Sequence, residues 1–140
     1  MADPDCIFCR IVAGKLPSVR VYEDEHVVAF LDIHPIARGH TLVIPREHCE
    51  NLLDAPQDAL AAILAASPRI ARAAMAATGA EGFNFFQFNG GCSGQEVMHL
   101  HFHIIPRRAG DGVAFGWKQG GYGEGEMAAL GHSVRDALEP

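Results

Sequence analysis

Residues 98–106 have the sequence MHLHFHIIP, in which polar and apolar side chains alternate along one β-prone run. Successive side chains of a strand point to opposite faces, so His99, His101 and His103 are expected on one face, roughly 7 Å apart. The apolar residues between them face the other side. Packing alone does not explain three titratable rings in register, because each buried ring nitrogen needs a polar partner. The stretch therefore predicts a functional face on a strand.

A second β-prone run precedes the histidines and is joined to them by a glycine-rich segment. Residues 83–89 (FNFFQFN) and the loop 90–96 (GGCSGQE) predict an antiparallel hairpin. Glycines let several backbone N–H groups point into one concavity, and Asn89 and Gln95 add side-chain donors at its ends. Alone, such a loop would only turn the chain. Beside a face of three histidines it predicts a cradle for phosphate.

The cysteines favour a metal site over disulfides. Cys6 and Cys9 form a C-x2-C pair, and the other two cysteines are isolated. Zinc needs four ligands, and no second pair follows at zinc-finger spacing, so further ligands must come from afar. His48, just after a predicted strand, and His99 are the candidates. The alternative is that both cysteines are ordinary small buried residues. Four protein ligands would make the zinc structural, with no open position.

The remaining periodicities predict an α+β fold: an antiparallel sheet of about five strands, one main helix, and short N-terminal and C-terminal helices. The main helix is expected over 56–78, with apolar residues from Leu60 to Met75, including Leu64, at the three-four spacing of a buried stripe. Pro68 lies within it and should bend it or remove one hydrogen bond. The strands are predicted at 19–23, 26–31, 41–44, 83–89 and 98–106.

We expect one domain over 1–140, with a motif-bearing core at 6–107 and a variable tail at 108–140. The tail begins with a glycine-rich connector, and residues 126–138 have the apolar spacing of an amphipathic helix.

Length and charge exclude several classes of protein. No uninterrupted apolar run approaches the ~20 residues that span a bilayer, so no membrane partner is expected. The first residues carry neither a basic nor an apolar stretch, which indicates no secretory signal and a cytoplasmic protein. The formal net charge of −6 argues against a nucleic-acid partner. A phosphate-bearing substrate would have to be held by local donors.

Four ordered motifs resemble those of the histidine triad (HIT) superfamily of nucleotide hydrolases and transferases, in the bacterial-type branch close to the Hint nucleoside phosphoramidases. They are CIFCRI at 6–11, FLDIHP at 30–35, GHTLVIPREH at 39–48 and QEVMHLHFHIIPR at 95–107. The resemblance implies the HIT fold, a homodimer joined through the main helix and a sheet edge, and a purine nucleotide or derivative as substrate. It also matches Cys6, Cys9, His48 and His99 to a structural zinc set.

The same resemblance implies a reaction. His101 would attack the α-phosphorus of a nucleoside phosphoramidate or related nucleoside 5'-phosphate derivative, giving a covalent nucleotidyl-histidine that water resolves. His103 completes the catalytic pair and, with Asn89 and Gln95, would hold the phosphate oxygens. The other matched contacts are the backbone N–H groups near Glu96 and Val97 for the phosphate, Asp32 for the ribose hydroxyls, and Phe8, Ile11 and Ile33 for the base.

One residue departs from the pattern and leaves the leaving group open. Glu96 stands where the Hint branch usually has a serine, and a carboxylate there would repel an anionic substrate if it pointed inward. The alternatives are a dinucleoside polyphosphate hydrolase and a nucleotide-binding partner protein with residual activity. A catalytic metal held by all three triad histidines is disfavoured, because alternate residues of one strand are too far apart to reach one ion.

Overall fold

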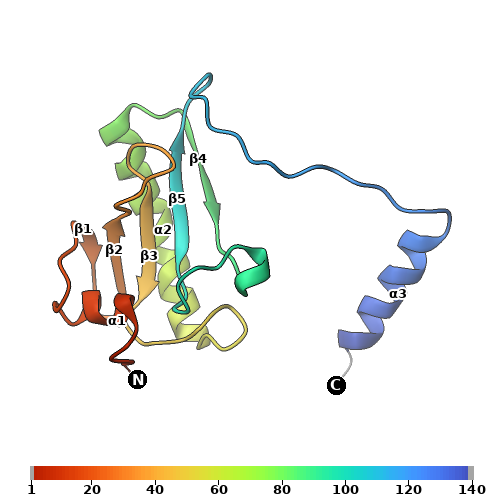
Figure 1. Cartoon of the computed structure of the whole chain (residues 1–140), viewed down its shortest axis with the longest axis horizontal. Coiled ribbons are helices and arrows are strands. Elements are labelled where there is room, and N and C mark those ends of the chain that lie inside the picture. The colour runs from red at the N-terminus through yellow and green to blue at the C-terminus, as the bar shows by residue number, and fades with distance from the viewer. Residues whose placement is uncertain (1, 139–140) are drawn as a thin grey trace.

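The computed structural model, which describes residues 2–138, is a five-stranded antiparallel sheet with three α-helices, as the sequence predicted. The strand order is β1-β2-β3-β5-β4, so β1 and β4 are the two edges (Figure 1). The elements are α1 (Ile7–Val12), β1 (Arg20–Glu23), β2 (Val27–Leu31), β3 (Thr41–Pro45), α2 (Gln57–Thr78), β4 (Gly82–Phe86), a 3-10 turn η1 (Gly91–Ser93), β5 (Phe102–Arg107) and α3 (Glu126–Leu138).

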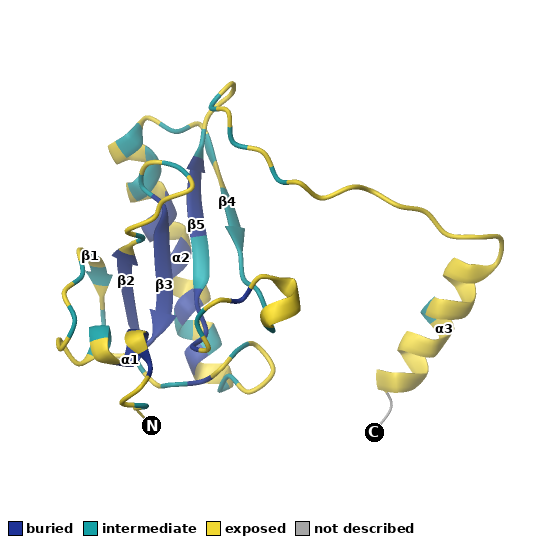
Figure 2. Cartoon of the chain, viewed as in Figure 1, coloured by how far each residue is buried: buried dark blue, intermediate teal, exposed yellow. Residues whose placement is uncertain are grey.

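Each face of the sheet carries its own apolar cluster. On one face, Val43, Leu100 and Ile104 pack with the buried side of α2. On the other, the smaller helix α1 packs Phe8 against residues of β2 and β3 such as Phe30. The three central strands are the buried part of the molecule (Figure 2). The apolar residues that alternate with the triad histidines are thus on the α2 side, as their spacing predicted.

The hairpin is confirmed, but the predicted last strand is too long at its start. β4 pairs with β5 from Gly82↔Arg107 to Phe86↔His103, and β5 begins only at Phe102. The reason lies in β3, whose last residue Pro45 has no N–H to donate to a ladder. The amide of Leu100 instead donates to the carbonyl of Cys49, at 2.8 Å. His99 and His101 therefore precede the strand.

The main helix α2 runs without interruption through Pro68, from an N-cap at Pro56 to a left-handed C-cap at Gly79. Its buried stripe is narrower than predicted: Ile63 and Ile70 are buried, whereas Leu64 is 54% exposed because it faces away from the sheet. By length and composition alone α2 could span a membrane. Its buried residues form part of the main core cluster, as in a core helix.

The predicted C-terminal helix forms, but it lies away from the sheet (Figure 1). The two last residues of the predicted tail fall outside the described range. Arg107 fixes the start of this tail, because its guanidinium contacts both carboxylate oxygens of Asp111, at 2.7 and 3.0 Å, and the carbonyl of Val113. Farther along, Phe115 packs edge-on against Phe86 of β4, at 5.8 Å between ring centroids. The tail thus leaves the body across β4.

Gly39 offers a test of the packing that sets the start of β3. Its φ is +86°, and a Cβ added there would lie 2.8 Å from Thr78 and 3.1 Å from Pro106. Gly39→Ala should therefore cost backbone strain of roughly 1–2 kcal/mol and a further ~1–3 kcal/mol of overpacking. Gly79→Ala is the matched control, since φ is +72° there and nothing lies within 4 Å. Denaturant unfolding of both variants checks this; equal losses would contradict it.

Candidate active site and metal centre

The middle histidine of the triad is held with one ring nitrogen bonded and the other available. His101 is buried, and its Nδ1–H donates to the backbone carbonyl of His99, at 2.7 Å. Burial lowers the pKa of His101, although the bond to His99 and the charges of Asp32 and Glu96 act in the opposite direction. The ring is thus a neutral imidazole with a fixed tautomer, and its Nε2 lone pair is a potential nucleophile.

The tautomer of His103 is set by a chain of hydrogen bonds that starts at a backbone amide. The N–H of Ile36 donates to Nδ1 of His40, at 3.1 Å, so the ring proton of neutral His40 is on Nε2. That Nε2 lies 2.9 Å from Nδ1 of His103 and donates to it. Burial, as the largest cause, lowers the pKa of His103 to about 4 and also lowers that of His40. His103 consequently presents Nε2–H as a donor.

His40 is the site residue that the sequence reasoning left without a role. It lies within a quoted motif, but its function depends on the register Leu42↔His103 between β3 and β5, which brings it to the triad face. Asp32 joins the same cluster, with a carboxylate oxygen 3.7 Å from Nε2 of His40. A fourth histidine immediately before a predicted strand was the available signal.

Aromatic rings hold the two catalytic-face histidines in place. Phe86 stacks on His103, at 4.8 Å between centroids and 17° between planes. Phe8 meets His101 edge-on, at 5.1 Å and 84°. The rings of His101 and His103 are themselves 5.1 Å apart, closer than the ~7 Å expected for a straight strand.

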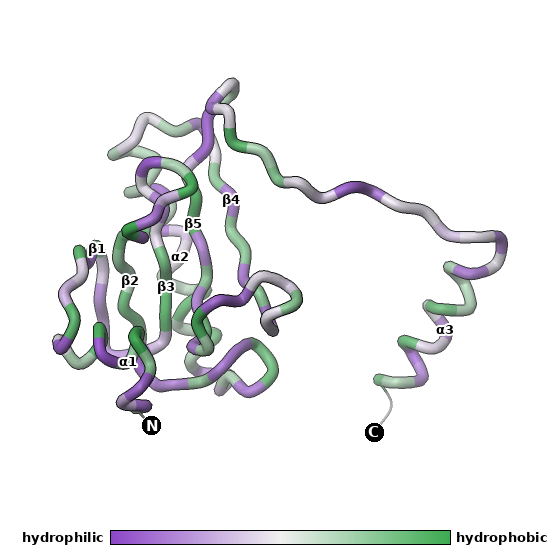
Figure 3. Tube along the Cα trace, viewed as in Figure 1, coloured by the Kyte–Doolittle hydropathy of each residue, from purple (hydrophilic) through white to green (hydrophobic). Residues whose placement is uncertain are grey.

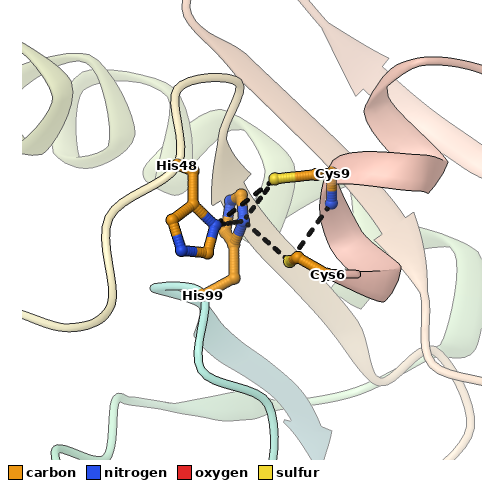
Figure 4. Close-up of side chains that lie close together, drawn as sticks. All are labelled: Cys6, Cys9, His48 and His99. Carbon is orange, nitrogen blue, oxygen red and sulfur yellow. Dashed lines mark hydrogen bonds between the residues drawn. The ribbon is translucent and has the colours of Figure 1, made fainter. Parts of the chain in front are cut away.

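The first histidine of the triad faces a different cluster, formed with the C-x2-C pair (Figure 4). Nδ1 of His99 lies 3.4 Å from Sγ of Cys6, 3.5 Å from Sγ of Cys9 and 3.2 Å from Nδ1 of His48. Nε2–H of His99 donates to the carbonyl of Pro45, at 2.9 Å, which leaves Nδ1 unprotonated and directed at the two sulfurs. The structure therefore brings together all four residues of the predicted metal site.

The cluster fits a tetrahedral zinc ion. Zinc–nitrogen and zinc–sulfur bonds of about 2.05 and 2.3 Å imply ligand separations of roughly 3.3 Å between nitrogens and 3.6 Å between sulfur and nitrogen. The observed separations of 3.2–3.5 Å lie within a few tenths of an ångström of these values. Backbone N–H groups of Asp3 and Cys9 also donate to the sulfurs of Cys9 and Cys6. The bond from Cys9 lowers the pKa of the Cys6 thiol, but burial is the larger effect and raises it.

In the glycine-rich loop, the side-chain amides of Asn89 and Gln95 bond to other groups of the protein, whereas we expected them to be free donors. Both donors of Gln95 are used inside the protein, on the carbonyls of Glu50 and Val97, and its oxygen accepts from the N–H of Gly90. Gln95 thus has no unbonded side-chain N–H in this structure, and its contact with a phosphate stays a prediction. Its role is to shape the loop. Asn89 is similarly engaged, accepting from the N–H of Leu52 and exchanging bonds with Gln87.

The residues expected around the ribose and the base are only partly gathered. Asp32 is half-buried beside His40, and one of its oxygens accepts from the N–H of His34. Phe8 is 5% exposed and packs on His101, so it offers little surface to a base. Ile33 is 85% exposed. Ile11 lies in α1. Glu96 and Val97 lie in the loop after η1, where Glu96 is exposed and Val97 is half-buried.

The sequence model of the HIT domain family matches residues 13–110 of this chain. The chain belongs to the HIT family. Within it the chain is in the Hint-like branch: it is 37% identical to adenosine 5'-monophosphoramidase of Schizosaccharomyces pombe, over 96% of this chain and 98% of the yeast protein. It is 40% identical to an adenylylsulfatase of Arabidopsis thaliana, over 76% of this chain and 54% of the plant protein.

Solved HIT structures have the same fold. A protein of Streptococcus mutans superposes with a TM-score of 0.92 at 43% identity, covering 98% of this chain and 87% of that one. A zinc-bound histidine triad family protein of Mycobacterium smegmatis superposes with a TM-score of 0.76 at 39% identity, covering 95% of this chain and 97% of that one.

The hydrogen-bond chain through His40 makes a spectroscopic prediction for this HIT protein. In the native chain, ¹⁵N shifts at neutral pH should show Nδ1 of His103 as an acceptor and Nε2 as the protonated nitrogen, because His40 donates to Nδ1. His40→Phe removes that donor and should leave His103 in a mixture of tautomers. His26→Ala, at an exposed histidine, should leave the signal of His103 unchanged. An unaltered tautomer in His40→Phe would contradict the assignment.

Proposed function

We propose that the chain is a HIT-type hydrolase of nucleoside 5'-phosphate derivatives, and that His101 forms a covalent nucleotidyl intermediate. The observation that carries this is the pair of fixed tautomers on one face. His101 has its Nδ1 bonded to the carbonyl of His99 and its Nε2 free, while neighbouring His103 presents Nε2–H. A nucleophile and a donor for the phosphate oxygens thus stand side by side.

The first step exchanges one bond to phosphorus for another. Nε2 of His101 attacks the α-phosphorus, and the leaving group departs with the electron pair of its bond and takes a proton from water. His103 donates to a non-bridging oxygen as charge develops there. The carbonyl of His99 accepts from Nδ1–H and stabilises the positive charge of the phosphorylated ring.

The second step is hydrolysis of the intermediate. Water attacks phosphorus, the bond to Nε2 breaks, and the electron pair returns to His101, giving a nucleoside monophosphate and the neutral ring. The proton that water loses balances the one taken by the leaving group. Because the ring remains neutral before and after the cycle, its lowered pKa suits the reaction.

The substrate class follows from the named relatives and from Glu96. One relative is named for a phosphoramidate substrate and another for an adenylylsulfate, and in both substrates a labile group is attached to the α-phosphate of an adenosine nucleotide. A purine nucleotide with a labile group on its α-phosphate is therefore the proposed substrate. Glu96 is exposed, so its carboxylate can lie away from an anionic substrate. Parallel assays on adenosine phosphoramidate, adenylylsulfate and a dinucleoside polyphosphate rank the leaving groups, and binding without any turnover would oppose the proposal.

His101→Ala should reduce turnover by several orders of magnitude, because no other side chain can form the intermediate. His103→Ala should be less severe, since it removes one donor and leaves the nucleophile. Quenching the native enzyme during turnover of an α-labelled substrate should trap an acid-labile nucleotide adduct on His101. Substantial turnover by His101→Ala, or an adduct on His99, would refute the mechanism. The exposed His26→Ala serves as the matched control.

We also propose that Cys6, Cys9, His48 and His99 hold one structural zinc ion. The convergence of two sulfurs and two ring nitrogens supports this, as does the zinc-bound relative of Mycobacterium smegmatis. Bound zinc supplies a cross-link among four donors and has no open position for chemistry. The chain's own residues do the rest: the cluster ties α1 to the segment that carries the nucleophile.

Purified protein should contain close to one zinc per chain by elemental analysis. Cys9→Ser removes a ligand, so it should abolish stoichiometric zinc and lower the melting temperature, because such sites contribute folding free energy. Cys92→Ser is the control, since that cysteine is exposed and is not one of the four residues of the cluster. Native protein that lacks zinc and melts like Cys9→Ser would refute the site.

The single domain over 1–140, the homodimer and the cytoplasmic location stay predictions from the sequence. For the homodimer, β4 supports the expected sheet-edge interface, because it has a strand partner on one side only.

A further inference from the structure

The C-terminal helix α3 exposes an apolar stripe that the body of the same chain, meaning the sheet with α1 and α2, does not cover. Met127, Leu130, Val134 and Leu138 follow the three-four spacing of one helix face, and they are 68, 49, 55 and 76% exposed. No residue of α3 is buried. Figure 1 shows the helix at the end of an extended segment, and Figure 3 shows apolar and polar residues alternating along it.

A helix of this length does not hold itself together in water. Isolated helices shorter than about 12–15 residues are marginal, and most helical stability in proteins comes from packing an amphipathic face. α3 has 13 residues, including Gly131 in its interior, which lowers its intrinsic stability further. An unpacked α3 would also leave four large apolar side chains in water. The helix therefore requires a surface to pack on.

The body carries a matching surface on the α2 side of β1. A groove with a volume of about 740 Å³ lies between β1, the end of β2 and the C-terminal half of α2. Its α2 wall is made mainly of small apolar residues, which suits the close approach of a second helix, and Asp32, Arg38, His40 and Arg69 also line it. The residues that form the floor and walls include Val21, Leu31, Ile70, Ala73, Ala74 and Ala77.

The connection to α3 leads away from this groove. β1 and β4 are opposite edges of the sheet, the groove borders β1, and the tail leaves across β4. Arg107 and Asp111 fix the direction of exit, and Phe115 packs on Phe86 of β4. Figure 1 shows α3 well beyond the β4 edge. In this arrangement α3 is displaced from the groove of its own chain toward the side where a second copy would pair with β4.

The extended arrangement is shared by a relative. The Streptococcus mutans structure matches 98% of this chain with a TM-score of 0.92. That coverage leaves no room to omit the tail and α3, which make up residues 108–138. An unsupported segment would not be expected to keep the same extended course in two proteins with 43% identity. The recurrence indicates that a contact outside the chain holds the tail.

We propose that α3 of one copy packs its apolar stripe into the groove beside β1 of a second copy, and that the two copies exchange this helix reciprocally. The interface adds α3 to the contact through the main helix and a sheet edge that is expected of HIT proteins. The exchange covers both the apolar stripe of α3 and the groove beside β1 in each chain. A two-fold axis at the open edge of β4 lets the same contact form twice. The occupant of the groove is thus the same protein.

Cross-linking between two distinguishable chains tests this directly. One chain carries Leu130→Cys and the other carries Ala77→Cys with a different affinity tag, both in the background of Cys92→Ser. After mild oxidation, a disulfide between the tags can only be intermolecular. We expect the pair to cross-link efficiently at micromolar protein. Ala129→Cys, on the opposite face of α3, replaces Leu130→Cys as the matched control and should cross-link at least tenfold less.

A second measurement keeps the proposal testable without disulfides. Leu130→Asp should weaken self-association at least tenfold in sedimentation equilibrium, because each copy buries that side chain, while Ala129→Asp should stay within twofold of the native protein. Because no residue of α3 is buried, neither variant should disturb folding of the sheet. Cross-linking within a single chain carrying both cysteines, or equal association of both aspartate variants, would overturn the exchange. So would a native protein that is monomeric at these concentrations.

Discussion

The hydrogen bond from Nδ1 of His101 to the carbonyl of His99 is the constraint on which the site depends. It fixes which ring nitrogen of His101 is free, and it does so through the backbone of His99, whose side chain has other partners. His99 directs one ring nitrogen at the cysteine cluster and the other at the carbonyl of Pro45. The same residue therefore belongs to the Cys2His2 cluster by its side chain and contacts His101 by its main chain. A displacement of α1 would be transmitted to the proposed nucleophile through this single residue.

Burial is what makes neutral imidazoles suitable here. Three histidines in proximity would repel each other if charged, and removal from water lowers the pKa of each below its ordinary value. The face therefore acts through directed N–H groups and lone pairs rather than through net positive charge. This agrees with the acidic chain as a whole, which offers no long-range attraction for a phosphate.

Much of this arrangement was predictable because it is periodic or local. Alternation around the histidines predicted the two faces of the hairpin. The C-x2-C pair suggested a metal site with His48 and His99 as candidates, and the family resemblance completed the four-residue set. The exceptions depend on register and on competition for hydrogen bonds. His40 acts through strand pairing that no local pattern specifies, and Pro45 ends the ladder for want of one N–H. Gln95 looked available because one of its backbone partners, Glu50, is distant in sequence, and the local partners Val97 and Gly90 depend on how the loop folds.

The composition of β4 affects the tendency of the newly made chain to aggregate. Its five residues, Gly82–Phe86 (GFNFF), contain no charge and no proline, the two devices by which natural edge strands usually discourage pairing with foreign strands. Such a strand, rich in phenylalanine and open along one side, is a template for aggregation. As long as this edge is unpaired, the protein is at risk of misassembly, and a high local concentration of nascent chains would raise that risk.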